Sequence, residues 1–404
     1  ILQKVALSEG TRPIDGHSPG LSGRDLYAYL LTGVGTDHEC NTLSEAKEKL
    51  EAGMRIMIRE GSTAKNLSVL ASLVTPVNER RCLLVSDDRR PGDLWSEGHL
   101  DWILRRAVEE KIDPILAIRM VTINVAETFG LNDRGAIKPG WWADLVLFES
   151  LKEFKVLAVW KRGRLVAEEN LPSFTTAPTA VPLENSISIP PMNGEIFEVR
   201  DIGKPVRVIE IVADRIWTRQ RVMKLDSVGG QLCASPEKDV AKLVVIERHQ
   251  GSGRLAIGFV RGLGLNRGAL GSTVAHDSHN VIIAGMDDIS IKTALEAILE
   301  AKGGLVATDH HQILGRMALP IAGLMSDDEI SKVVAQEEHL LRVAHQLGSP
   351  LSDPFMTLSF LALPVIPELK LSDRGLVDAT KLQLVSLYVE ERPEYGGAEV
   401  PFIG

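Results

Sequence analysis

The chain has 404 residues, of which 44% are hydrophobic and 25% are charged, as in ordinary water-soluble globular proteins. This length is sufficient for two or three domains. The 45 basic and 54 acidic residues give a formal net charge of −9, so general attraction to nucleic acid or to an anionic membrane is not expected. No apolar run reaches the roughly 18 residues that a membrane-spanning helix needs.

The three cysteines, Cys40, Cys82 and Cys233, are odd in number and widely spaced. This usage favours buried or incidental thiols in a reducing compartment over disulfides. The opening residues lack the charged region and apolar core of a signal peptide. We therefore expect a cytoplasmic protein.

Residues 1–130 are expected to alternate between strand and helix, a pattern typical of α/β proteins with a parallel sheet. Short strands are expected before His17 and before His38. Two more are expected over residues 54–58 and 81–86. The expected helices run from residue 22 or 23 to 30, from the Thr42–Glu45 capping box to 53, and over 67–74, 94–111 and 114–129.

After Gly135 the sequence pattern changes from alternating strands and helices to short strands. Short strands are expected over residues 145–148, 156–160 and 164–167, and residues 171–191, with five prolines, are interpreted as a linker. Residues 192–404 are expected to form an α+β domain with strands over 206–212, 243–247, 255–260 and 281–284 and helices over 291–302 and, from the capping box Ser326–Glu329, to 348.

Two histidines and a carboxylate are the leading candidates for chemistry. His17 and His38 are 21 residues apart, which suits one strand–helix–strand step. The apolar run from Cys82 ends in Asp87 and Asp88. The carboxyl ends of neighbouring parallel strands meet at one edge, where a β/α barrel carries its active site. The pattern indicates a metal site; the alternatives are separate structural histidines and a solvated acidic turn.

Other polar residues have weaker signals. Glu39 and Glu60 each follow an expected strand and could face a pocket, but structural ion pairs explain them equally well. Ser62 could donate to a ligand nitrogen or cap the next helix. The segment 274–280 is rich in metal-binding side chains, and a polar loop with incidental histidines is its alternative. The glycines between 262 and 268 do not have the spacing of a dinucleotide-binding loop.

Several of these segments resemble the adenine deaminases of the amidohydrolase superfamily. The resemblance covers nearly the whole chain and lies in residues 14–23, 36–40, 58–62, 85–88, 135–146, 274–280, 320–326 and 353–361. It implies that residues 1–130 are the second half of a metal-dependent hydrolase (β/α)8 barrel and 131–170 part of a small β-sandwich. By the same resemblance, residues 171–191 are a linker and 192–404 a C-terminal α+β domain.

One departure from the family concerns the N-terminal side of the barrel. Family members carry a His-x-His pair and a bridging Glu on earlier strands, whereas no His-x-His occurs in this sequence. Four expected strands cannot close an eight-stranded barrel, and a half-sheet would leave exposed edges. We therefore expect a further N-terminal segment of about 150–200 residues, judged from a typical barrel of about 250, and we expect these 404 residues alone to be inactive.

The resemblance also implies roles for individual residues. His17, His38 and Asp87 correspond to metal ligands, and Asp87 would also relay a proton. Asp88 and Glu60 are expected to assist catalysis. The residues expected to bind substrate are Glu39, Ser62, His276 and His279.

The function implied by the resemblance is hydrolytic deamination of adenine to hypoxanthine and ammonia by a homodimer. It implies two divalent metal ions, manganese or iron, with zinc as an alternative because affinity order and availability both intervene. Two other functions stay open: another amidohydrolase acting on a cyclic amidine or amide, or a truncated, inactive chain that serves as a scaffold.

Overall fold

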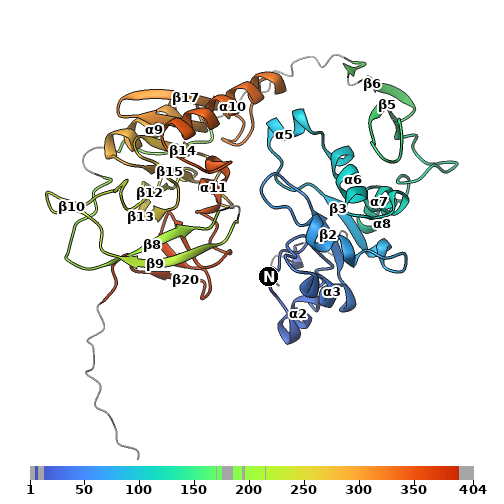
Figure 1. Ribbon diagram of the computed structural model, residues 1–404, viewed down its shortest axis with the longest axis horizontal. Coiled ribbons are helices and arrows are strands. Elements are labelled where there is room, and N and C mark those ends of the chain that lie inside the picture. The colour runs from blue at the N-terminus through green and yellow to red at the C-terminus, as the bar shows by residue number, and fades with distance from the viewer. Residues whose placement is uncertain are drawn as a thin grey trace, which may run out of the picture. The chain divides into compact units, whose positions relative to one another are not determined.

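The computed structural model describes residues 5–7, 13–169, 171–174, 185–192, 196–213 and 215–390. It divides the chain into two compact units, residues 1–180 and 181–404 (Figure 1). No helix among these residues is long and apolar enough to cross a membrane. All three cysteines are free thiols, as the sequence predicts.

The first unit contains a parallel sheet of three strands in the order β1-β2-β3: β1 (Thr36–Asp37), β2 (Arg55–Arg59) and β3 (Cys82–Val85). The strand expected before His17 is reduced to one parallel bridge between Ile14 and Val34. Strands β1, β2 and β3 therefore form an open sheet whose carboxyl ends share one edge.

The α-helices around these strands in the chain are α2 (Gly23–Leu30), α3 (Leu43–Glu51), α4 (Leu67–Leu70), α5 (Pro91–Ser96), α6 (Leu100–Glu109), α7 (Pro114–Val121) and α8 (Ile123–Thr128). Of these, α3 and α4 contact β2, and α6, α7 and α8 contact β3. The single helix expected over 94–111 is wrong, because this segment forms two helices. Gly98, with φ +106°, lies between α5 and α6. The helix expected over 114–129 is broken at Thr122, where φ is −126° and ψ is −94°. The Thr42 cap is confirmed, since its side chain accepts from the Glu45 amide at 3.3 Å.

A separate antiparallel sheet follows in the order β4-β5-β6-β7. Its strands are β4 (Leu145–Phe148), β5 (Val156–Lys161), β6 (Arg164–Glu168) and β7 (Leu171–Pro172). The first three confirm the expected strands. The fourth lies at the start of the segment interpreted as a linker, of which residues 175–184 lie outside the described part of the chain.

The second unit is built on an eight-stranded sheet in the order β17-β16-β14-β15-β12-β13-β8-β9. Its strands are β8 (Val206–Ile211), β9 (Thr218–Met223), β12 (Val240–Ile246), β13 (Leu255–Arg261), β14 (Ala269–Ser272), β15 (Val281–Gly285), β16 (Gly304–Asp309) and β17 (Gln312–Ala318). The remaining elements are α9 (Asp288–Glu300), α10 (Ile330–Gln346), α11 (Pro354–Phe360), the hairpin β10 (Ser227–Val228) and β11 (Gln231–Leu232), and the small sheet β18 (Leu369–Ser372), β19 (Gly375–Asp378) and β20 (Gln383–Val385).

Helices cover both faces of this sheet (Figure 1). Along β12, Leu243 and Val245 pack in a core with residues of α10 and α11, whereas Val244 and Ile246 pack in a second core with residues of α9. A strand buried on both faces reads as a continuous apolar run, which is why β12 was visible in the sequence.

The start of α10 differs from the expectation. The predicted capping box would place Ser326 at the helix start, but the helix begins at Ile330 and Glu329 is its N-cap without a side-chain cap bond. Ser326 instead accepts from the Asp328 amide at 3.1 Å, a local turn that competes with helix capping.

Candidate active site

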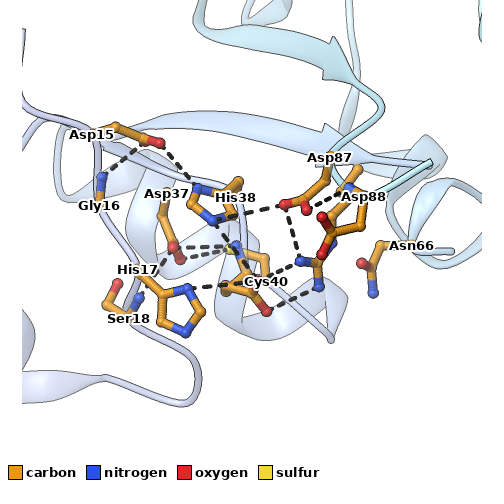
Figure 2. Close-up of polar contacts among 12 residues, drawn as sticks. Asp15, Gly16, His17, Ser18, Asp37, His38, Cys40, Asn66, Asp87 and Asp88 are labelled. Atoms are coloured by element: carbon orange, nitrogen blue, oxygen red, sulfur yellow. Dashed lines mark hydrogen bonds and ion pairs between the residues drawn. The ribbon is translucent and has the colours of Figure 1, made fainter. Parts of the chain in front are cut away.

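His38 follows β1, and its ring lies between Asp15 and Asp87 (Figure 2). Its Nδ1 is 3.1 Å from Asp15 Oδ2 and its Nε2 is 3.9 Å from Asp87 Oδ2. The hydrogen bond with Asp15, with help from the charges of Glu39 and Asp87, raises the pKa of His38 although burial opposes this. An imidazole held at one nitrogen by a carboxylate presents the other to a metal ion, as at many protein metal sites.

Asp15 was not among the residues predicted for the site. Its Oδ1 accepts hydrogen bonds from Thr36 Oγ1 at 2.5 Å and from the Gly16 amide at 2.8 Å. Burial opposes ionisation of Asp15, but the bonds from His38 and Thr36 outweigh burial and hold its pKa below the usual value. Asp15 is therefore an ionised acceptor that orients the His38 ring.

His17 lies beside His38, with ring centroids 5.5 Å apart. Its Nδ1 is 3.6 Å from Glu39 Oε1, and Glu39 Oε1 is also 3.8 Å from His38 Nε2. One ligand atom from each of His17, His38 and Glu39 lies within 4.8 Å of the others. The structure thus brings the two predicted histidines together and adds Glu39 to them.

Arg59, at the end of β2, links two carboxylates of this cluster. Its Nη2 donates to Glu39 Oε2 at 2.9 Å, and its Nη1 contacts Glu39 Oε1 and donates to Asp87 Oδ2 at 3.2 Å. Both Arg59 and Glu39 are buried, so the two-pronged pairing compensates charges that are removed from water. Arg59 was not predicted as a site residue, because its role depends on contacts with Glu39 and Asp87, which are distant in sequence.

Asp87 follows β3 and is the carboxylate that contacts both His38 and Arg59. Its backbone has φ +54°, a left-handed conformation that aspartate adopts more readily than most residues. Its Oδ1 accepts from the Asp88 amide at 2.6 Å. The Asp88 carbonyl accepts from the Ser62 amide at 3.0 Å, which ties the loops after β2 and β3 together.

Glu60 and Ser62 are not brought into contact with the histidines. Glu60 Oε2 accepts from the Leu67 amide at 3.1 Å at the start of α4, and burial raises the pKa of Glu60. Ser62 Oγ accepts from the Arg90 amide at 2.8 Å. In this structure both side chains form hydrogen bonds that stabilise the loops after β2 and β3.

His276 and His279 belong to the second unit, with ring centroids 5.6 Å apart. His276 Nδ1 is 2.5 Å from Ser359 Oγ, and its ring stacks on Phe360 with centroids 4.8 Å apart. Burial lowers the pKa of His279. Their assignment as substrate-binding residues stays a prediction.

The donor types in the first unit fit a divalent cation. Two imidazoles and the carboxylates of Glu39 and Asp87 are ligands that manganese, iron and zinc all accept in proteins. The Asp15 carboxylate behind His38 supplies the outer contact that metal-binding histidines usually have.

Comparison with known proteins agrees with this chemistry. Residues 3–166 match the amidohydrolase family, and residues 215–383 match the adenine deaminase C-terminal domain. The adenine deaminase of Desulfatibacillum aliphaticivorans is 44% identical over 391 residues, covering 96% of this chain and 68% of that protein. Adenine deaminase 2 of Carboxydothermus hydrogenoformans is 45% identical over 387 residues, covering 95% and 68%. The chain has the α/β fold of the amidohydrolase family, and it belongs to the adenine deaminases.

Proposed function

We propose that this chain contributes the metal site of an enzyme that hydrolyses adenine to hypoxanthine and ammonia. Its place among the adenine deaminases supports the substrate. The observation that carries the chemistry is the convergence of His17, His38, Glu39 and Asp87 where parallel strands end. This is the edge at which barrels of this kind perform catalysis.

Three side chains are proposed to hold the metal: His17, His38 through Nε2, and Asp87. When bound, a divalent ion lowers the pKa of a coordinated water so that the water becomes nucleophilic near neutral pH. We propose manganese or iron, with zinc as the alternative. Two ions are the family's implication, and the donors above are sufficient for one of them.

Asp87 is proposed to move the proton. The water oxygen adds to C6 of adenine, the bond from C6 to the exocyclic nitrogen breaks, and that nitrogen leaves as ammonia. One proton of the water goes to the leaving nitrogen and the other ends on N1 of hypoxanthine. The Asp87 carboxylate accepts a proton from the water and returns it to the departing nitrogen. Arg59 Nη1, 3.2 Å from Asp87 Oδ2, holds the Asp87 side chain in place both before and after it accepts the proton.

Glu39 is proposed to orient the purine ring by accepting a hydrogen bond from a ring N–H. Its two oxygens are fixed by Arg59, so the carboxylate is held in place before substrate binds. A fixed acceptor favours one ring orientation and places C6 near Asp87.

The surrounding architecture is proposed on the same resemblance. The three-stranded parallel sheet is proposed to be part of a (β/α)8 barrel, and residues 131–170 part of a small β-sandwich. We further propose that the enzyme acts as a cytoplasmic homodimer.

The metal assignment is tested with His17→Asn and His38→Asn in the full-length protein. Each variant is expected to lower bound metal and to abolish deamination, because each removes an imidazole ligand. His310→Asn, an exposed histidine of the second unit, is the matched control and should change neither. Normal metal content and turnover in both site variants would refute the assignment.

The proton relay is tested by replacing the adjacent carboxylates Asp87 and Asp88 by asparagine, one at a time. Asp87→Asn should lower turnover at least about 10²-fold, the scale of a lost proton-transfer group. Asp88→Asn should cost less, because Asp87 is the carboxylate that contacts His38. The opposite ranking would assign the relay to Asp88.

A further inference from the structure

Lys49, on α3, is completely buried, and its ammonium group contacts three oxygens. It donates to the Ser18 carbonyl at 2.6 Å, to Asp37 Oδ2 at 2.6 Å and to Glu45 Oε1 at 2.7 Å. An ammonium has three donors, so all of them are used. Burial alone would lower the pKa of Lys49, but its bonds to Asp37 and Glu45 raise it, so the group is charged.

Asp37, the partner of Lys49, is also completely buried and directly precedes His38. Its Oδ1 accepts from the Ser18 amide at 3.2 Å and from the Glu39 amide at 3.2 Å. Ser18 follows His17, and Glu39 follows His38. One carboxylate therefore holds the backbone next to both candidate metal ligands.

Regular strand pairing does little to hold the His17 segment. Before β1, the one β-bridge of the described chain joins Ile14 to Val34. The other bonds of this segment run through side chains: Thr36 Oγ1 bonds to Asp15 and accepts from the Gly16 amide, and the His17 amide donates to the Tyr29 hydroxyl. At Ser18, however, the amide is bound by Asp37 and the carbonyl by Lys49. The charged pair thus replaces the missing strand contacts at the point where His17 must be placed.

We propose that Asp37 and Lys49 form a positioning pair that sets the separation of His17 and His38 and so determines affinity for a divalent metal ion. The inference rests on the metal site of the proposed function. It adds two residues that touch neither metal nor substrate, and it predicts that their loss weakens metal binding while His17 and His38 are still present.

Lys49 also determines which variant tests this proposal. Asp37, Cys40 and Glu45 offer ligand atoms within 4.8 Å of one another. The Lys49 ammonium is bound to two of these residues and so stands where an ion would bind. Removing Lys49 alone would leave these acidic groups unpaired and able to bind a metal ion themselves, which would confuse the measurement.

The test is the double variant Asp37→Leu/Lys49→Met in the full-length protein, because leucine cannot accept the Ser18 and Glu39 amide bonds. Asp37 and Lys49 lose their charges together, and Glu45, the other partner of Lys49, keeps 11% of its side chain exposed, so the fold is expected to persist. Cobalt(II) is titrated into metal-free protein and followed by its visible absorption. Cobalt affinity should fall about 10–100-fold, the usual cost of losing an outer contact at a metal site.

Lys47→Met is the matched control, because Lys47 lies on the same helix with 68% of its side chain exposed, and cobalt affinity should not change. If the double variant does not fold, Asp37→Ala alone is used, since alanine cannot accept the two amide bonds and Glu45 still compensates Lys49; cobalt affinity should fall about tenfold. Wild-type affinity in a folded variant overturns the positioning role. Failure of the unmutated protein to bind cobalt would instead overturn the proposed metal site.

Discussion

Lys370, on β18, is a residue whose charge is at odds with its surroundings. It is completely buried, and its ammonium nitrogen donates to the carbonyls of Ile216 at 2.8 Å and Phe360 at 3.1 Å. Burial lowers the pKa of Lys370 to about 7. In an unfolded chain a lysine has a pKa of about 10.4, so folding changes the protonation of this group across the alkaline range.

This shift predicts a pH-dependent stability. Between pH of about 7 and about 10.4 the unfolded chain binds a proton at Lys370 that the folded chain does not, so its contribution to stability rises with pH. Lys370→Met removes the dependence. Its free energy of unfolding relative to the unmutated protein should therefore be most favourable near pH of about 6 and decline by about pH 9.

Denaturant unfolding of both proteins at each pH measures this difference, and other titrating groups cancel in the comparison. The carbonyls of Ile216 and Phe360 lose a donor in the variant, which adds a cost that does not change with pH. A difference in stability that is constant across this range would contradict the lowered pKa.

At the residue scale, the sequence predicted part of the candidate site. His17 and His38 each follow a short run that could be a strand, and Asp87 follows an apolar run; parallel strands bring such positions together. Asp15 and Arg59 could not be predicted, because their roles arise from contacts between residues twenty or more positions apart. A side chain that only orients another leaves no local pattern.

At the scale of elements, the loops after β2 and β3 are packed against each other at Gly61. A Cβ atom at Gly61 would lie 2.7 Å from the Ser86 carbonyl oxygen and 2.9 Å from that of Asp88. Both oxygens belong to backbone that cannot rotate away. The absence of a side chain at residue 61 therefore allows the β3 loop, which carries Asp87, to approach.

Gly61→Ala is expected to displace the β3 loop and with it Asp87. The strain should lower the free energy of unfolding by about 1–3 kcal/mol, the usual cost of overpacking, and should reduce adenine turnover. Gly35→Ala is the matched control, since a Cβ there meets no atom within 4 Å. Denaturant unfolding and steady-state rates measure both effects; equal behaviour of the two variants would show that the approach at Gly61 is not required.

Elements differed in how well the sequence predicted them. Strands β2, β3, β12 and β15 contain apolar runs and were predicted, although β12 begins at Val240, three residues before the expected start. Strand β14, Ala269–Ser272, was not, because its small residues have weak strand preference and only its place between β15 and β16 defines it. The continuous helix expected across residue 98 was also wrong, because the backbone leaves the helical conformation at Gly98.

At the scale of the whole molecule, each hydrophobic core formed by the described residues lies within one unit. One core belongs to the first unit and includes Leu26, Ile56 and Leu104. The other three belong to the second unit, where they lie on both faces of the eight-stranded sheet and along β8. Since apolar burial is the main stabilising contribution to folding, the second unit has its own source of stability.

We therefore expect residues 181–404, expressed without the first unit, to fold into a stable protein with one cooperative thermal transition. The fragment should not turn over adenine with any added metal, because His17, His38, Glu39 and Asp87 all lie in the first unit. Circular dichroism and calorimetry measure the transition, and the full-length protein is the activity control. Gradual unfolding without a cooperative transition would show that the second unit depends on the first, and adenine turnover by the fragment would place the catalytic groups elsewhere.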